Sequence, residues 1–247
     1  MRRAGITDQD QLESRNLRTP RAAAVAGIIF AALLITALVL LRVSAPAHPS
    51  DTGAWLASPG NRGELAVALN LVPFAGIAFL WFIGVLRDRI GDREDRFFAT
   101  VFLGSGLLFV AMLFVGAAVA GATIAVAGSR LPGVDVLVLS RNVTSSLLNV
   151  YAMRMAAVFT LTTVNIARRT RIVSPWLIYA GLACAVVLLI GIGISPWVEL
   201  VFPAWIMALS VDILAAGRRD AAAERLPAPG QVLRAAGSWL CAGQGSW

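Results

Sequence analysis

The chain has 247 residues, of which 58% are hydrophobic and only 14% are charged. Soluble domains carry about 25% charged residues, so this composition excludes a water-soluble globular fold. The formal net charge of +7 comes from arginines clustered beside apolar runs, which favours membrane topology signals over nucleic-acid binding.

Apolar runs of membrane-spanning length follow one another along the chain. A stretch of about 18 or more apolar residues is typical of a transmembrane helix. We expect spans at residues 22–41, 65–86, 97–128, 143–167, 176–194 and 197–216. The sequence therefore predicts an all-α, polytopic transmembrane helix bundle with about six spans over residues 22–216.

The first run raises the alternative of a cleaved signal peptide. Its 20 apolar residues exceed the core of about 7–15 residues found in signal peptides. The stretch Ala45-Pro46-Ala47 resembles a small-residue cleavage site. Length favours an uncleaved membrane anchor.

Polar segments surround these spans. Residues 1–21 are expected to be a short, disordered cytoplasmic lead, and residues 217–247 a mobile cytoplasmic tail. The apolar run 134–139 is too short to cross a bilayer and is expected to lie in the interface. Whether residues 129–141 and 231–242 form interfacial helices is left open.

The distribution of arginine indicates the orientation. With the N-terminus inside, the cytoplasmic segments hold 16 arginines, and the outer segments hold four, namely Arg42, Arg62, Arg130 and Arg141. Arginine and lysine accumulate in cytoplasmic loops. We therefore expect a multi-pass protein of the cell (plasma) membrane with cytoplasmic N- and C-termini.

Motifs of known membrane enzymes are missing from the sequence. It contains neither HExxH nor GxSxG, and neither a P-loop nor a GxGxxG fingerprint. One histidine and two distant cysteines, Cys184 and Cys241, do not favour a zinc or haem site. We expect no metal, no cofactor and no catalytic residues.

Arg154 is an arginine within an apolar run. Placing arginine at the centre of a membrane helix costs about 2.5–3.5 kcal/mol, so such residues usually face the bundle interior. With a rise of 1.5 Å per residue, Arg154, Asn70 and Glu199 lie about 21, 25 and 28 Å above the arginines that end their spans. All three are thus expected in the outer half of the membrane.

Our hypothesis is an intramembrane polar cluster in which Arg154 faces inward and pairs with Glu199. Asn70 is the expected neighbour, and Asn149 and Tyr151 are secondary members. One interpretation is a structural clamp between two spans. A second is an outward-facing pocket for an anionic solute or a lipid headgroup. In a third, Arg154 only extends to the outer interface.

The run from Phe79 to Phe98, FLWFIGVLRDRIGDREDRFF, resembles uncharacterised bacterial multi-pass membrane proteins of actinobacterial type. The resemblance covers roughly residues 20–216. It implies a multi-pass membrane layout and assigns no role to any residue.

The residues favour a non-enzymatic membrane component, either a small-solute carrier or a subunit of a membrane assembly. Its expected partners are the lipid bilayer and other subunits in a homo- or hetero-oligomer. A purely structural membrane protein is one alternative. An intramembrane enzyme acting on lipid is another, but it would need clustered acids or histidines, and the acids within the spans are scattered.

Overall fold

The structure, a computed structural model, describes residues 4–44, 58–90, 96–129, 133–170, 173–191 and 197–223. All regular structure in these ranges is helical, which confirms the all-α class. The helices are α1 (Ala4–Ser44), α2 (Pro59–Ile90), α3 (Arg96–Ser129), α4 (Val134–Ser145), the π-helical η3 (Ser146–Ala152), α5 (Met153–Thr170), α6 (Pro175–Ile190), the 3-10 turn η4 (Val198–Leu200) and α7 (Val201–Ala223).

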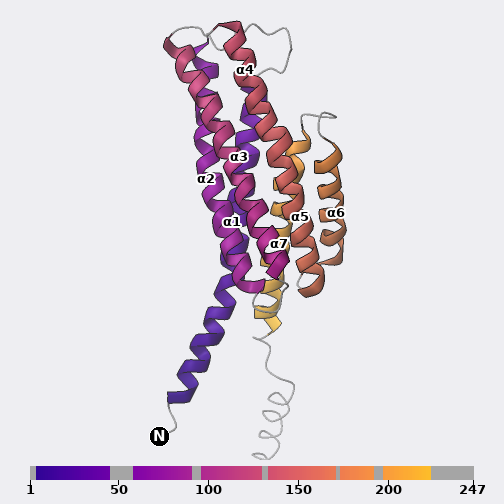
Figure 1. The fold of residues 1–247 in the computed structure, drawn as a ribbon. Coiled ribbons are helices and arrows are strands. Elements are labelled where there is room, and N and C mark those ends of the chain that lie inside the picture. Colours follow the sequence, from indigo (N-terminus) through magenta and orange to yellow (C-terminus); the bar gives the residue numbers. More distant parts are fainter. Residues whose placement is uncertain are drawn as a thin grey trace, which may run out of the picture.

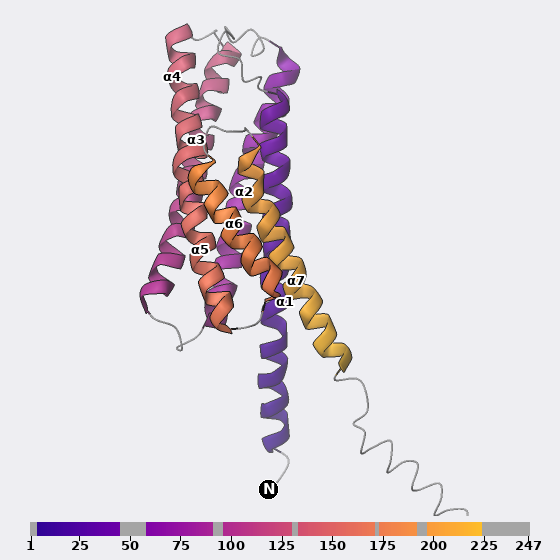
Figure 2. The same ribbon diagram turned by 90° about the vertical axis from the view of Figure 1, so that its right-hand side faces the viewer.

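Successive helical segments run in alternate directions along one elongated bundle (Figures 1 and 2). Helix α1 packs against α2 and α7, α3 packs against α2 and α5, and α6 packs against α5. We call the end that carries Arg87, Arg168 and Arg218 the arginine-rich end, and the other the far end. Helices α2, α3 and α4 continue past α6 and α7 at the far end (Figures 1 and 2).

Five segments of the described chain are long and apolar enough to cross a membrane, which supports a multi-pass membrane protein. They are Arg21–Val43, Gly60–Arg87, Phe97–Ala127, Val134–Arg169 and Val198–Arg219. The remaining expected span corresponds to α6, an apolar helix of 16 residues. Its length of about 24 Å falls short of a hydrocarbon core of about 30 Å.

The expected interfacial run 134–139 is not a separate element. It forms the start of a continuous helical segment, Val134–Thr170, made of α4, η3 and α5. No glycine or proline occurs between residues 134 and 170, so the usual helix-ending residues are missing. A helix can be longer than the bilayer is thick. The length of a membrane span alone therefore placed the start of this helix at residue 143, whereas the helical segment begins at Val134.

The ends of the chain also differ from expectation. Helix α1 begins at Ala4, so most of the expected disordered lead 1–21 is helical. A polar segment joined to an existing helix needs no new nucleation step, which removes the main cost of becoming helical. Helix α7 continues to Ala223, beyond the expected boundary at 216, and residues 231–242 lie outside the described residues.

Phenylalanines from five helices fill the middle of the bundle. Each is 0% exposed: Phe30, Phe79, Phe82, Phe102, Phe109, Phe159 and Phe202. The ring of Phe79 has its centroid 4.5 Å from that of Phe30 and 5.1 Å from that of Phe159. Aromatic pairs of this kind add about 0.5–1.5 kcal/mol beyond burial of their area. The rings thus hold α1, α2, α3, α5 and α7 together.

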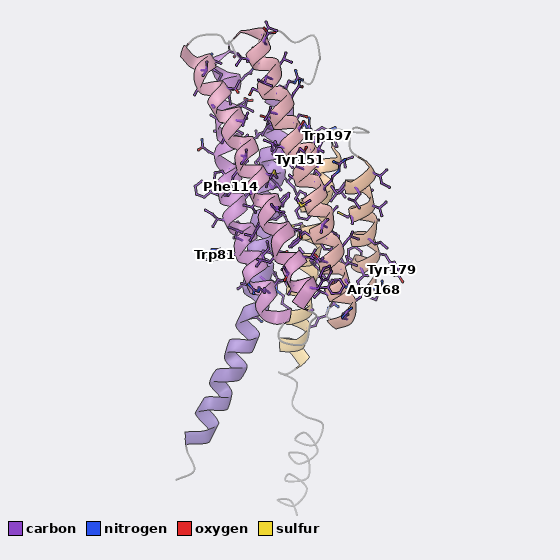
Figure 3. All side chains as sticks on the ribbon, in the orientation of Figure 1. Trp81, Phe114, Tyr151, Arg168, Tyr179 and Trp197 are labelled. Carbon is purple, nitrogen blue, oxygen red and sulfur yellow. The ribbon has the colours of Figure 1, made fainter. Side chains whose placement is uncertain are left out.

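Exposed aromatic side chains lie at two levels of the bundle. Trp81 and Tyr179, at 70% and 73% exposure, lie towards the arginine-rich end on opposite sides of the bundle, whereas Tyr151 and Trp197 lie further towards the far end (Figure 3). Tryptophan and tyrosine are enriched at the two interfaces of a membrane. These levels are consistent with a bilayer around the phenylalanine-packed part of the bundle.

Candidate functional site

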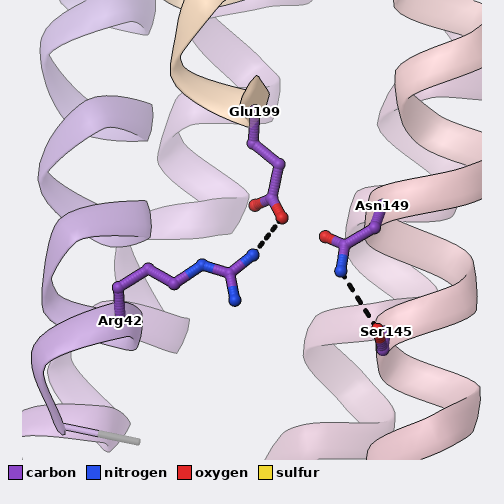
Figure 4. Close-up of polar contacts among 4 residues, drawn as sticks. All are labelled: Arg42, Ser145, Asn149 and Glu199. Carbon is purple, nitrogen blue, oxygen red and sulfur yellow. Dashed lines mark hydrogen bonds and ion pairs between the residues drawn. The ribbon is translucent and has the colours of Figure 1, made fainter. Parts of the chain in front are cut away.

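An ion pair joins the last turn of α1 to the turn that precedes α7. Nη2 of Arg42 donates to Oε1 of Glu199 (Figure 4). The side chain of Glu199 is 9% exposed and that of Arg42 27%. A carboxylate so far removed from water is costly unless it is paired. Arg42 supplies the compensating positive charge. The ion pair therefore links the first helix of the chain, α1, to the turn before the last described helix, α7.

Asn149 points into the same space from the opposite side. Its Nδ2 donates to Oγ of Ser145, 3.0 Å away, and its amide faces the carboxylate of Glu199 (Figure 4). No hydrogen bond between described residues joins Asn149 to Glu199 directly. We call Arg42, Glu199, Asn149 and Ser145 the far-end cluster.

A π-helical segment carries Asn149. The seven residues of η3 interrupt the α-helical pattern between α4 and α5. Because a π-turn holds more residues than an α-turn, it changes the directions of the side chains that follow. Such insertions are frequent at functional sites. The local geometry of η3 thus sets the direction of Asn149 towards the ion pair.

Three members of the far-end cluster, Arg42, Glu199 and Asn149, lie at nearly one level along the bundle. Arg42 is 21 residues after Arg21, which is about 31 Å along the helix. Glu199 and Asn149 are each 19 residues before the first arginine at the arginine-rich end of their own segments, or about 28 Å. A hydrocarbon core is about 30 Å thick. A core of this thickness that begins at the arginine-rich end would end close to these three residues.

The expected pair between Arg154 and Glu199 does not form. Arg154 is exposed on α5 instead of facing the interior, and Glu199 is occupied by Arg42. The partner of a buried carboxylate must reach the same level and the same interior space. Arg42 meets both conditions, whereas Arg154 starts lower and points out of the bundle.

The other predicted members separate into two groups. The amide of Asn149 points towards the carboxylate of Glu199 in Figure 4, and its only described hydrogen bond goes to Ser145. Asn70 is exposed on α2, and its Nδ2 donates to the carbonyl of Ala66 at 2.8 Å. Tyr151 is 55% exposed and, like Arg154, lies on the outside of the bundle. The cluster is thus smaller and differently composed than expected.

Arg42 and Ser145 are the two members that sequence reasoning missed. Arg42 follows the first apolar run directly, a position that marks it only as a flanking topology signal. Counting residues from Arg21 would have placed it at nearly the height of Glu199. Ser145 precedes Asn149 by one helical turn, the spacing at which side chains on a helix meet.

The chemistry available in the far-end cluster is that of a polar clamp. The two charges neutralise each other, and the amide of Asn149 can both donate and accept hydrogen bonds. Asp212, an acid within α7, accepts hydrogen bonds from the backbone N and Oγ of Ser174 at 3.1 and 2.9 Å. It therefore fastens α7 to the residue before α6 at the other end of the bundle.

Known proteins provide no further guide to this site. Neither family models nor curated proteins nor solved structures match this chain. Among the described residues, no three or more histidine, cysteine, aspartate or glutamate side chains are grouped so that they could hold a metal ion. The geometry of the bundle is therefore the basis on which we infer its function.

Proposed function

We propose that the chain is a non-enzymatic subunit of a membrane assembly in the cell membrane, with its far end outside the cell and both termini in the cytoplasm. The observation that carries this proposal is an exposed apolar face of α4. Val136, Leu139 and Val143 are 57%, 65% and 39% exposed. Their spacing of three and four residues places them on one side of the helix.

Helix α4 has little cover from the rest of the chain. None of its residues is buried, and its main neighbours are α3 and η3. The hydroxyls of Thr123 and Ser140 are in hydrogen-bond contact across the α3–α4 interface. This contact leaves Val136 and Leu139 more than half exposed, so the apolar face is available to another molecule.

The height of this face along the bundle indicates that another protein, and not lipid, covers it. Leu139 is 29 residues before Arg168, or about 43 Å along the helical segment. A hydrocarbon core of about 30 Å would end well below that level. An apolar stripe beyond the lipid is typical of a protein interaction surface. We therefore assign the stripe Val136–Leu139–Val143 as the docking surface of the assembly.

A small-solute carrier has less support. Carriers bind substrate near the bilayer midplane, and here Phe79 and Phe159 lie about 12–14 Å above the arginine-rich end with 0% exposure. The buried hydroxyls of Thr160 and Thr163 donate to carbonyls of their own helix at 2.8 and 2.7 Å. An enzyme acting on lipid is also less supported, because Glu199 and Asp212 are each engaged at opposite ends.

Site-specific photo-crosslinking in native membranes tests the assembly role. We would introduce Leu139→p-benzoylphenylalanine and compare it with the same replacement of Leu182, which is 46% exposed on α6. We expect a protein–protein adduct from position 139 and lipid adducts alone from position 182. Two differently tagged copies of the chain would tell a homo-oligomer from a hetero-oligomer. Lipid adducts alone at both positions would refute a docking surface on α4.

A further inference from the structure

Arg154 is a charged residue on the outside of the bundle within a membrane-spanning segment. It is exposed, and among the described residues it forms no hydrogen bond or ion pair. An arginine facing lipid costs about 2.5–3.5 kcal/mol unless it reaches a polar partner. The position of Arg154 in the bundle should therefore indicate which polar group outside the chain its guanidinium can reach.

The direction of α5 carries the side chain of Arg154 towards the far end. Side chains on a helix lean towards its N-terminus and cover the turn before their own Cα. The N-terminal end of α5 is the end nearer the far end of the bundle (Figure 1). Arg154 is 14 residues before Arg168, so the guanidinium of Arg154, one turn higher, lies about 26 Å up.

Tyr151 lies at this same level. It precedes Arg154 by three residues, is 55% exposed, and lies about 25 Å above the arginine-rich end. Residues three apart on a helix are surface neighbours. Tyrosine at a membrane boundary places its ring in lipid and its hydroxyl among the headgroups. The Arg154 guanidinium just inside the far-end boundary and the Tyr151 hydroxyl among the headgroups thus present donors on neighbouring turns.

We propose that Arg154 and Tyr151 bind the phosphate of an anionic lipid headgroup in the far-end leaflet. The planar guanidinium donates paired hydrogen bonds that match phosphate oxygens, and the tyrosine hydroxyl adds a further donor. Lipid phosphates lie just beyond the far-end boundary of the hydrocarbon and are the nearest anions around the protein. This site is separate from the far-end cluster and from the α4 docking surface, so it does not depend on the proposed assembly role.

Thermal unfolding of the purified protein in neutral detergent tests the site. We would titrate phosphatidylglycerol, with phosphatidylcholine and inorganic phosphate as parallel arms. Phosphatidylglycerol is expected to raise the midpoint of unfolding, and Arg154→Gln to weaken its apparent affinity about tenfold, the effect of losing one charge-assisted hydrogen bond of about 1.4 kcal/mol. Arg154→Lys should recover part of the loss, because it keeps the charge but not the fork.

A comparison of single and double variants shows whether Arg154 and Tyr151 bind the same headgroup or whether Arg154 only attracts anionic lipid by its charge. Tyr151→Phe should weaken the lipid response in the wild-type chain and in Arg168→Gln, but add little in Arg154→Gln. Tyr179→Phe, at the other end of the bundle, is the control for losing an exposed hydroxyl. Additive effects of Arg154 and Tyr151, an unchanged response in Arg154→Gln, or equal stabilisation by phosphatidylcholine or inorganic phosphate would overturn the proposal.

Discussion

At the scale of single residues, the Arg42–Glu199 pair is the main charged contact described between α1 and the start of α7. Its carboxylate is almost completely removed from water, whereas its guanidinium keeps some contact with solvent. Removing one member of a buried pair leaves an uncompensated charge, which costs more than the pair itself gains. The pair should therefore act as a clamp, and its contribution to the free energy of unfolding should become measurable when one partner is removed.

We predict that Arg42→Gln and Glu199→Gln each lower the free energy of unfolding by roughly 1–3 kcal/mol, since a hydrogen bond to a charged group is lost near the end of the bundle. Combining Arg42→Glu with Glu199→Arg should recover more than half of the loss caused by either reversal alone. Denaturant unfolding of the purified protein measures these values. Arg87→Gln, an exposed arginine at the other end, is the matched control.

Failure of the charge exchange to recover stability would argue against a simple clamp. It would indicate instead that the far-end cluster requires its charges in their present places, as a binding pocket does. Asn149→Ala provides a second comparison, because Asn149 faces Glu199 without bonding to it directly. A clamp tolerates this change, whereas an occupied pocket does not.

Which arginine pairs with Glu199 could be predicted only in part. Residue counting along each span gave the level of Glu199, and the amide of Asn149 points towards its carboxylate in Figure 4. Counting gives height but not direction, so it did not distinguish the inward Arg42 from the outward Arg154. A helix that is apolar on every side offers no pattern that marks its buried face.

At the scale of elements, α1 and α7 approach each other closely at one glycine. A Cβ atom on Gly27 would overlap Oγ of Ser210 and lie 3.0 Å from the ring of Phe82. Small residues let membrane helices approach, and Ala23 and Gly27 are four residues apart. Such spacing favours a close helix contact, but it does not indicate that α7 provides the other side.

We predict that Gly27→Ala lowers the free energy of unfolding by about 1–3 kcal/mol, the usual cost of overpacking a closely packed interior. Adding Ser210→Gly should restore much of the loss, because it removes the hydroxyl that the added methyl group would meet. Gly84→Ala on α2 is the control, since its Cβ would meet nothing within 4 Å. Equal losses from Gly27→Ala and Gly84→Ala would show that the contact with Ser210 is not limiting.

At the scale of the whole molecule, the alternation of apolar and arginine-rich segments was enough to predict an all-α bundle. The long apolar runs indicated where most helices cross. They did not determine the lengths of α4 and α6, because a helix ends where its hydrogen bonds and caps end and not where lipid ends. The grouping of seven phenylalanines from five helices depends on three-dimensional packing, which periodicity does not encode in uniformly apolar helices.

The orientation of the bundle in the membrane determines on which side of the membrane the α4 docking surface and the Arg154–Tyr151 lipid site lie. The sequence predicts sixteen arginines in cytoplasmic segments and four in outer segments, because positive residues accumulate in the cytoplasm. We therefore predict that Asp135→Cys, in a chain with Cys184→Ser and Cys241→Ser, reacts with a membrane-impermeant maleimide in intact cells. Gly217→Cys in the same background should react only after permeabilisation. With the opposite labelling pattern, α4 would dock a cytoplasmic protein, and Arg154 would meet lipids of the inner leaflet.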